Sequence, residues 1–222
     1  MATARRERYR QQTREEAKAV ALTQLAESGT AGISVNAIAK AMGMTGPALY
    51  RYFAGRDELL TELITDAYRE LAAVAVAAAE AADGAAPADR FRALAHALRD
   101  WAKRQPDRYL LIYGTPVPGY QAPPETTESA GTLMRTILDA CAALDRAAEP
   151  TPLEAELARQ LEGVPPWAPG PEPDGELKSR ALATWTRLHG VISLEVQGQF
   201  SGMGFDPAAL FEAEIGALVR GA

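Results

Sequence analysis

The chain has 222 residues, of which 47% are hydrophobic and 23% are charged, and its formal net charge is -6. Its single cysteine, Cys141, excludes an intrachain disulfide, and the lack of any uncharged apolar stretch of about 18 residues excludes a membrane-spanning helix. The N-terminal residues are charged, unlike a secretory signal, so we expect a cytoplasmic protein that needs no cofactor and no membrane.

The first 43 residues predict two helices. Apolar residues recur at helical spacing in the first of them, and Gly29 follows as a residue that ends helices. Those apolar residues are Ala17, Val20, Ala21 and Leu25. A shorter second helix is expected over residues 35–42, with Ser34 as its N-terminal cap and Gly43 at its end.

A third helix is predicted from its cap, Thr45, through Phe53. Pro47 falls in its first turn, where the missing N–H of proline costs nothing. A fourth helix is expected over residues 56–82, because leucines and small apolar residues continue one helical stripe to that point. Residues 1–82 therefore predict four helices, of which the second and third are short and the fourth is long.

The rest of the chain also predicts helices, and no strand. The expected helices cover residues 88–104, 106–114, 125–147, 153–161, 176–200 and 207–219. Two loops rich in proline and glycine separate some of them, and the second contains Trp167. The sequence therefore predicts an all-α protein.

The second and third helices form a predicted helix-turn-helix, since a tight glycine turn joins them. In that motif the second helix enters the major groove of DNA with its N-terminus first. Gly46 and Pro47 keep this helix start narrow, which lets the protein backbone approach the base edges. Thr45 is placed to contact a phosphate or a thymine methyl group.

Further residues around this motif are candidates for DNA contacts. Tyr50 and Tyr52 are within reach of phosphates, Arg51 and Arg56 can neutralise them, and Ser34 is another phosphate candidate.

The distribution of charge agrees with a nucleic-acid partner. Residues 1–57 hold nine Lys or Arg against five Asp or Glu, whereas the remaining residues hold 14 basic and 24 acidic side chains. A basic front end on an acidic body fits binding to nucleic acid, and a solvated basic arm would have the same composition.

The string ISVNAIAKAMGMTGPALYRYFAGRDELL resembles the DNA-binding signature of the TetR family of bacterial transcriptional regulators. In that signature an Ile-Ala pair, a glycine turn, a small-residue helix start, a Leu-Tyr-x-(Tyr or His)-Phe run and an acidic Glu-Leu segment follow in order. The resemblance covers about residues 13–64.

This resemblance implies an all-α homodimer with two domains in each chain. Residues 1–55 would form a three-helix domain that binds double-stranded operator DNA, and residues 56–222 would dimerise and bind an effector. Thr45, Gly46, Pro47, Tyr50, Tyr52 and Arg56 match positions that touch DNA in the family. Arg5 to Arg14 resemble the basic arms that some members lay along the adjacent minor groove. The family's usual mode further implies a repressor that a small molecule releases from its operator.

The C-terminal half resembles, more loosely, a branch of the family with a Trp-x3-His-Gly motif, here Trp185, His189 and Gly190. This resemblance implies an internal pocket for a largely apolar small-molecule effector. The candidate lining residues are Leu98, Trp101, Tyr113, Met134, Ile137 and Trp185, with Tyr113 and His189 as polar groups. The same side chains are also typical of a packed core.

Two other classes of function fit the sequence less well. Two histidines and one cysteine at these spacings predict no metal site, and the motifs of nucleotide-binding enzymes and hydrolases are missing, so we expect no catalysis. A helical ligand-binding or interaction module that does not bind DNA would keep the fold but lose the basic arm and Tyr50, and this chain has both.

Overall fold

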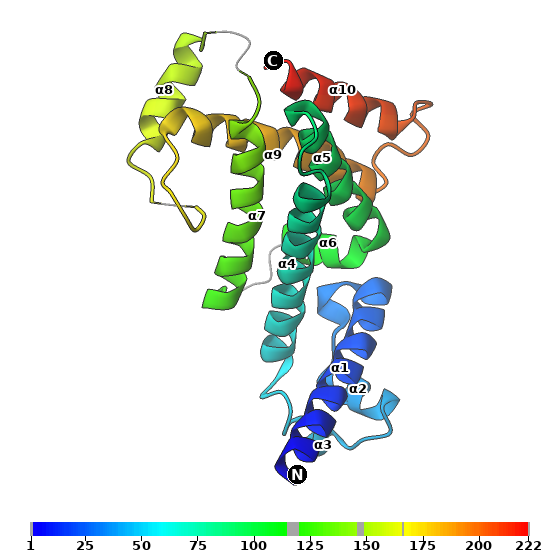
Figure 1. Ribbon diagram of the computed structural model, residues 1–222. Helices are drawn as coiled ribbons and strands as arrows, with labels where there is room; N and C mark the ends of the chain where they lie inside the picture. The colour runs from blue at the N-terminus through cyan, green and yellow to red at the C-terminus, as the bar shows by residue number, and fades with distance from the viewer. Residues whose placement is uncertain (1, 115–119, 146–148, 166, 222) are drawn as a thin grey trace. The chain divides into compact units, whose positions relative to one another are not determined.

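The computed structural model describes residues 2–114, 120–145, 149–165 and 167–221. These residues form helices and connecting segments without any strand, which confirms the predicted all-α class (Figure 1). The elements are α1 (Ala2–Ser28), the short 3-10 helix η1 (Thr30–Gly32), α2 (Val35–Ala41), α3 (Gly46–Leu49), α4 (Arg56–Ala81), α5 (Pro87–Arg104), α6 (Pro106–Tyr113), α7 (Pro124–Ala142), α8 (Pro152–Leu161), α9 (Gly175–Val196) and α10 (Pro207–Val219). Among the described residues, no helix combines the length and the apolar character that crossing a membrane requires.

The chain folds into two compact units, and α4 runs from one into the other. The first unit comprises Met1–Ala67 and Asp107–Pro123, and the second comprises Tyr68–Pro106 and Pro124–Ala222.

The first unit has a small core built from α1, α2, α3 and the first half of α4. Three of the four apolar residues predicted for the first helix are buried, and Gly29 ends that helix with a φ of 65°. Further large buried side chains of this core are Ile33, Val35, Ile38, Leu49, Phe53, Leu59, Leu60, Leu63 and Ile64. The core therefore fixes the helix-turn-helix against the start of the long helix.

The structure corrects the predicted bounds of four helices. The helical conformation of α1 begins at Ala2, long before its recurring apolar residues start at Ala17, because its Arg, Glu and Gln residues favour helix and pairs such as Gln11 and Glu15 bond across one turn. α3 ends at Leu49 rather than Phe53, because residues 50–52 form a non-helical turn that leads to α4. α7 ends at Ala142, where Arg180 caps its last carbonyls, and α9 ends at Val196, two residues before Gly198 turns to a φ of 72°.

The second unit is organised around α9, which contacts α5, α7, α8 and α10 (Figure 1). Its buried face consists of Ala181, Thr184, Leu188, Val191 and Ile192. The apolar face of α5, from Phe91 to Trp101, is buried as well.

Charged side chains also join the helices of this unit. Arg92 of α5 lies 3.8 Å from Asp89 and 3.7 Å from Glu212 of α10, and His96 places Nε2 2.6 Å from Glu212.

A buried ion pair ties α5 to α9. Arg99 donates two hydrogen bonds of 2.7 Å to the two carboxylate oxygens of Glu195, and Lys103 lies 3.1 Å from the same carboxylate. Burial opposes the charged form of Glu195, but the hydrogen bonds from Arg99 and Lys103 outweigh it and hold the pKa of Glu195 below its ordinary value. The pair thus stabilises the fold when the carboxylate is ionised.

Replacing Glu195 by Gln should destabilise the second unit by about 3 kcal/mol at pH 7, because it leaves the Arg99 charge buried without its carboxylate. The pKa of Glu195 is lower in the folded chain than in the unfolded one. Its contribution is therefore full above about pH 4.3 and is lost as the pH falls through the folded-state pKa.

Unfolding by urea at pH 7 and at pH 3 measures this difference, which should be smaller at pH 3. The exposed Glu156, which pairs with Arg159, is the matched control, and Glu156→Gln should leave the stability unchanged. An equal loss for both variants at pH 7 would contradict the role given to the buried pair.

Candidate functional site

The turn between α2 and α3 is a tight glycine turn, as the sequence predicts. Gly43 has a φ of 68°, a conformation that glycine adopts without steric cost. Its N–H bonds the carbonyl of Lys40 at 3.1 Å, and the N–H of Met44 bonds the carbonyl of Ala39 at 2.8 Å. These two bonds form a Schellman motif, which ends α2 and sets the direction in which the chain enters α3.

Both short helices begin at the predicted caps. The hydroxyl of Ser34 accepts a hydrogen bond from the N–H of Ala37, whereas the side chain of Thr45 makes no capping bond. Ser34, Thr45 and Pro47 are exposed. The Thr45 hydroxyl is therefore available to a partner outside the chain.

Gly46 at the start of α3 leaves room for a side chain of α2. A Cβ atom at this position would lie 2.5 Å from Oδ1 of Asn36 in α2. The glycine thus lets the Asn36 side chain pass close to the start of α3. Asn36 is itself exposed, and sequence reasoning did not select it.

The aromatic and basic residues after α3 differ in exposure. Tyr50 is 46% exposed and Arg51 is exposed, while Tyr52 is half-buried. Arg51 forms no ion pair or side-chain hydrogen bond with a described residue, so its charge faces solvent. Lys40 at the end of α2 is exposed in the same way. Lys40 lies in the last turn of α2, next to the glycine turn. That position could have identified it from the sequence as a candidate for contacting DNA.

Arg14 fastens α1 to the chain after α3. Its guanidinium donates to the backbone carbonyl of Tyr52 and forms ion pairs with Glu58 and Glu62 of α4. It also lies over the ring of Phe53, 4.5 Å from the ring centroid. Arg14, predicted as part of a basic arm, is therefore part of the domain's interior.

Two other predicted cations also have partners within the first unit. Lys18 lies 2.7 Å from both Glu15 and Asp66, and it is buried. Arg56, expected to contact a phosphate, donates a 2.6 Å hydrogen bond to the carbonyl of Thr30 in η1. It thereby joins the start of α4 to the segment after α1.

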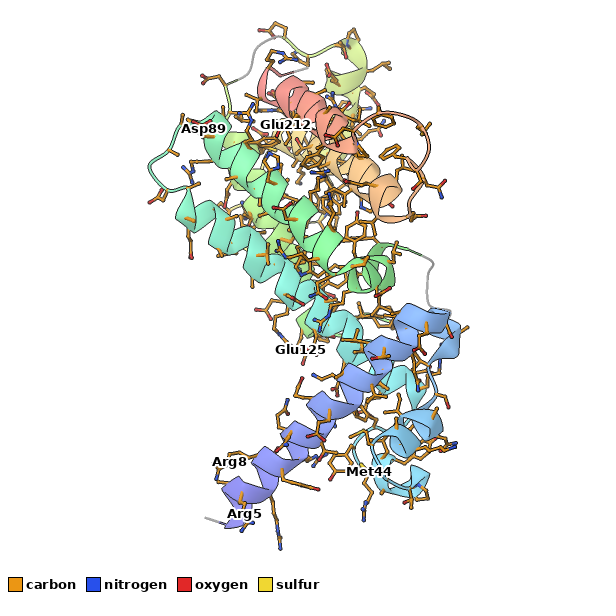
Figure 2. All side chains as sticks on the ribbon, turned by 90° about the vertical axis from the view of Figure 1, so that its right-hand side faces the viewer. Arg5, Arg8, Met44, Asp89, Glu125 and Glu212 are labelled. Atoms are coloured by element: carbon orange, nitrogen blue, oxygen red, sulfur yellow. The ribbon has the colours of Figure 1, made fainter. Side chains whose placement is uncertain are left out.

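The four arginines at the start of α1 have no such partners. Arg5, Arg6, Arg8 and Arg10 are exposed and form no ion pair with a described residue. They lie in the first turns of α1, and Tyr9 between them is 67% exposed. The N-terminal end of α1, with Arg5 and Arg8, and the turn with Met44 lie at the same end of the first unit (Figures 1 and 2). The basic arm is thus a helix.

The residues expected to bind an effector fall into three groups. Leu98, Trp101 and Ile137 are fully buried, while Met134, Trp185 and His189 are half-buried, all in the second unit. Tyr113 belongs to the first unit, where its ring lies 5.2 Å from that of Tyr109.

Trp185 and His189 stack on each other with ring centroids 5.2 Å apart. Burial lowers the pKa of His189, which favours its neutral form.

The second unit contains a cleft between α4, α5 and α7. Two cavities of about 330 and 410 Å³ share Val76, Glu80 and Thr132 in their walls. Arg90 and Arg135 line the first of these, and Arg135 also bonds the carbonyls of Pro169 and Pro171. Within the described ranges, no group of three or more His, Cys, Asp or Glu side chains is placed to hold a metal ion.

Family patterns match both parts of the chain. The pattern described as bacterial regulatory proteins, tetR family, matches residues 19–63, and the pattern described as tetracyclin repressor-like, C-terminal domain, matches residues 91–218. The chain belongs to the TetR family of bacterial transcriptional regulators. The first match contains α2, α3 and the turn between them, so the exposed helix-turn-helix residues lie in the part of the family that carries the DNA-binding domain.

Individual relatives agree with this assignment. The HTH-type transcriptional regulator Rv1816 of Mycobacterium tuberculosis is 38% identical over 218 residues, which cover 92% of this chain and 90% of the relative. The crystal structure of the candidate regulatory protein SCO4313 is 54% identical with a TM-score of 0.80, covering 96% of this chain and 97% of that one. A protein of unknown function from Rhodococcus sp. RHA1, 24% identical with a TM-score of 0.69 and 94% coverage of both chains, shares the fold.

Arg14→Ala should destabilise the first unit by about 2 kcal/mol, because it removes a charged hydrogen bond and two ion pairs that hold the chain after α3. The melting temperature would fall by about 4–8 °C. Arg10, one turn earlier in α1 and without a partner, is the matched control. Thermal melting followed by circular dichroism should show no change for Arg10→Ala, and equal melting temperatures for the two variants would refute the role of Arg14.

Proposed function

We propose that this TetR-family regulator binds a two-fold symmetric operator as a homodimer and represses transcription until a small molecule releases it. Residues 1–55 would carry DNA binding, and residues 56–222 would carry dimerisation and ligand binding. Such a protein acts on DNA in the cytoplasm and catalyses no reaction. The observation that carries the proposal is the division of the basic residues of the first unit into paired and unpaired ones.

The unpaired basic side chains are the ones that can form ion pairs with DNA phosphates. Six exposed basic residues without partners among the described residues flank the helix-turn-helix, whereas Arg14 and Lys18 pair with carboxylates of α4 and Arg56 donates a hydrogen bond to the carbonyl of Thr30. The unpaired ones are Arg5, Arg6, Arg8, Arg10, Lys40 and Arg51. An exposed cation that pairs with a phosphate releases counterions and breaks no internal bond, so these residues favour binding to any duplex.

Residues around the start of α3 are suited to reading bases. Thr45 and Pro47 are exposed, and the Thr45 hydroxyl makes no capping bond. Arg51 supplies a guanidinium that can bond the edge of a guanine, while Ser34 and Tyr50 reach phosphates. Asn36 beside Gly46 adds an amide that fits the edge of an adenine.

The outer face of α9 favours dimerisation. Ala183, Thr186, Gly190, Leu194 and Gln197 lie on one face and carry no charge. Leu194 is 44% exposed, and a Cβ atom at Gly190 would meet nothing within 4 Å. An exposed, uncharged helical face with space beside its glycine suits close packing against the same face of a second copy.

The second unit supports a site for a small-molecule effector. The cleft between α4, α5 and α7 offers open space, and Met134, Trp185 and His189, which do not line it, stay candidates for a separate lining. Leu98, Trp101 and Ile137 would enlarge the site only if the core opened. An effector must bind the state that does not bind DNA more tightly than the other, since equal affinity for both states shifts nothing.

Arg10→Gln should weaken binding to every duplex and reduce the salt dependence of binding. The slope of log K against log salt concentration would change by about 0.9 for each phosphate that the variant no longer neutralises. Arg56→Gln should leave this slope unchanged and lower the melting temperature, because Arg56 bonds Thr30. Fluorescence anisotropy over a range of salt concentrations measures both slopes. A slope that changes for Arg56→Gln and stays constant for Arg10→Gln would contradict the proposal that the cations without internal partners are the ones that contact phosphates.

A further inference from the structure

A second cavity lies in the second unit, away from the cleft between α4, α5 and α7. It has a volume of about 550 Å³, within the range of sites for small organic molecules, and it shares no lining residue with that cleft. Residues from the end of α7, from α8, from α9 and from the C-terminal end of α10 surround it. The cavity is therefore built largely by helices outside the cleft.

The walls of this cavity are mainly apolar. Leu144 follows α7, Leu157 and Ala158 come from α8, Ala183 comes from α9 and Leu218 comes from α10. Leu157 is 37% exposed although it lies over an apolar wall. Apolar surface of this kind favours a ligand with a hydrocarbon body.

One side of the cavity carries polar groups with hydrogen-bonding capacity to spare. Arg180 donates two bonds through Nη2, to the carbonyls of Cys141 at 2.9 Å and Leu144 at 3.1 Å. Its Nε and Nη1 bond no described residue, and it forms no ion pair with one.

The buried Cys141 thiol donates to the hydroxyl oxygen of Thr184 at 3.4 Å, which leaves the hydroxyl hydrogen of Thr184 free to donate. The polar side therefore offers donors to a ligand oxygen.

The other charged residues around the cavity limit the charge that a ligand can carry. Arg187 pairs with Glu214 at 2.7 Å, and Glu154 accepts a bond from the N–H of Thr151 at 2.7 Å. Glu149 and Glu176 also line the cavity. Three carboxylates and two guanidinium groups would repel a dianion more than a monoanion. Among the described residues of this wall, Arg180 differs from Arg187 in having no carboxylate partner.

We propose that this cavity binds a small apolar monocarboxylate, separately from any effector held in the α4–α5–α7 cleft. The carboxylate accepts hydrogen bonds from Arg180 and Thr184, and the hydrocarbon body lies against the leucines of α8 and α10. The inference goes beyond the proposed function, since it concerns a second site and needs no operator.

Calorimetric titration of the full chain with octanoate, and with octanol as a neutral probe of the same length, tests this assignment. Octanoate should bind at least about tenfold more tightly than octanol, because hydrogen bonds to a charged group add to the contact of the hydrocarbon. The Arg180→Gln variant should bind octanoate and octanol with about equal affinity, and its affinity for octanol should be that of the unmodified chain.

Two neighbouring residues of α8 supply variants that do not depend on Arg180. Ala155 lines the cavity and Glu156 does not, and both are exposed. Ala155→Trp should abolish the binding of both probes by filling the cavity, and Glu156→Trp should bind them as the unmodified chain does.

Three results would overturn the proposal: no saturable heat with octanoate, equal affinity for octanoate and octanol, or unchanged binding by Ala155→Trp. Dissociation of a dimer by Ala155→Trp, seen by size-exclusion chromatography without any octanoate binding, would also overturn it, by indicating that a second copy fills the cavity. These titrations contain no DNA, so their failure is distinct from a failure to bind an operator.

Discussion

The position of α3 depends on the guanidinium of Arg14. This one side chain bonds the carbonyl of Tyr52, pairs with two glutamates of α4 and lies over Phe53. α3 itself is only four residues long and has little intrinsic stability as a helix. Its direction is therefore set from outside, by the Schellman turn that precedes it and by the Arg14 contacts that follow it. Every DNA contact proposed from α3 relies on these two attachments.

The same type of side chain has opposite roles along α1. Arg14 and Lys18 point into the unit and are neutralised by residues of α4, whereas the arginines of the first three turns have no partner among the described residues. α1 is thus a stabilising helix over its second half and a charged, solvent-facing helix over its first. Because the two halves are continuous, the rigid second half fixes the direction in which the charged first half leaves the unit.

Features determined by nearby residues could be predicted from the sequence. Gly29, Gly43 and the Ser34 cap each act within a few residues of their own position, and each is found where it was expected. The backbone carbonyls that Arg14 and Arg56 bond lie 38 and 26 residues away, so only the tertiary structure shows that these guanidinium groups already donate hydrogen bonds within the unit. Periodicity likewise predicted helices in the regions of α5 and α9. It could not indicate which apolar faces pack tightly and which border a cavity, because that depends on how the helices are spaced.

The central claim is that the exposed helix-turn-helix reads a specific DNA sequence in a two-fold symmetric arrangement. Selection of bound duplexes from a random pool by the full chain measures this most directly. The account predicts an enriched pseudo-palindrome whose half-sites lie one helical turn, or a multiple of it, apart, about 10 base pairs centre to centre for a single turn. Enrichment of a lone half-site, or no enrichment over the starting pool, would contradict it.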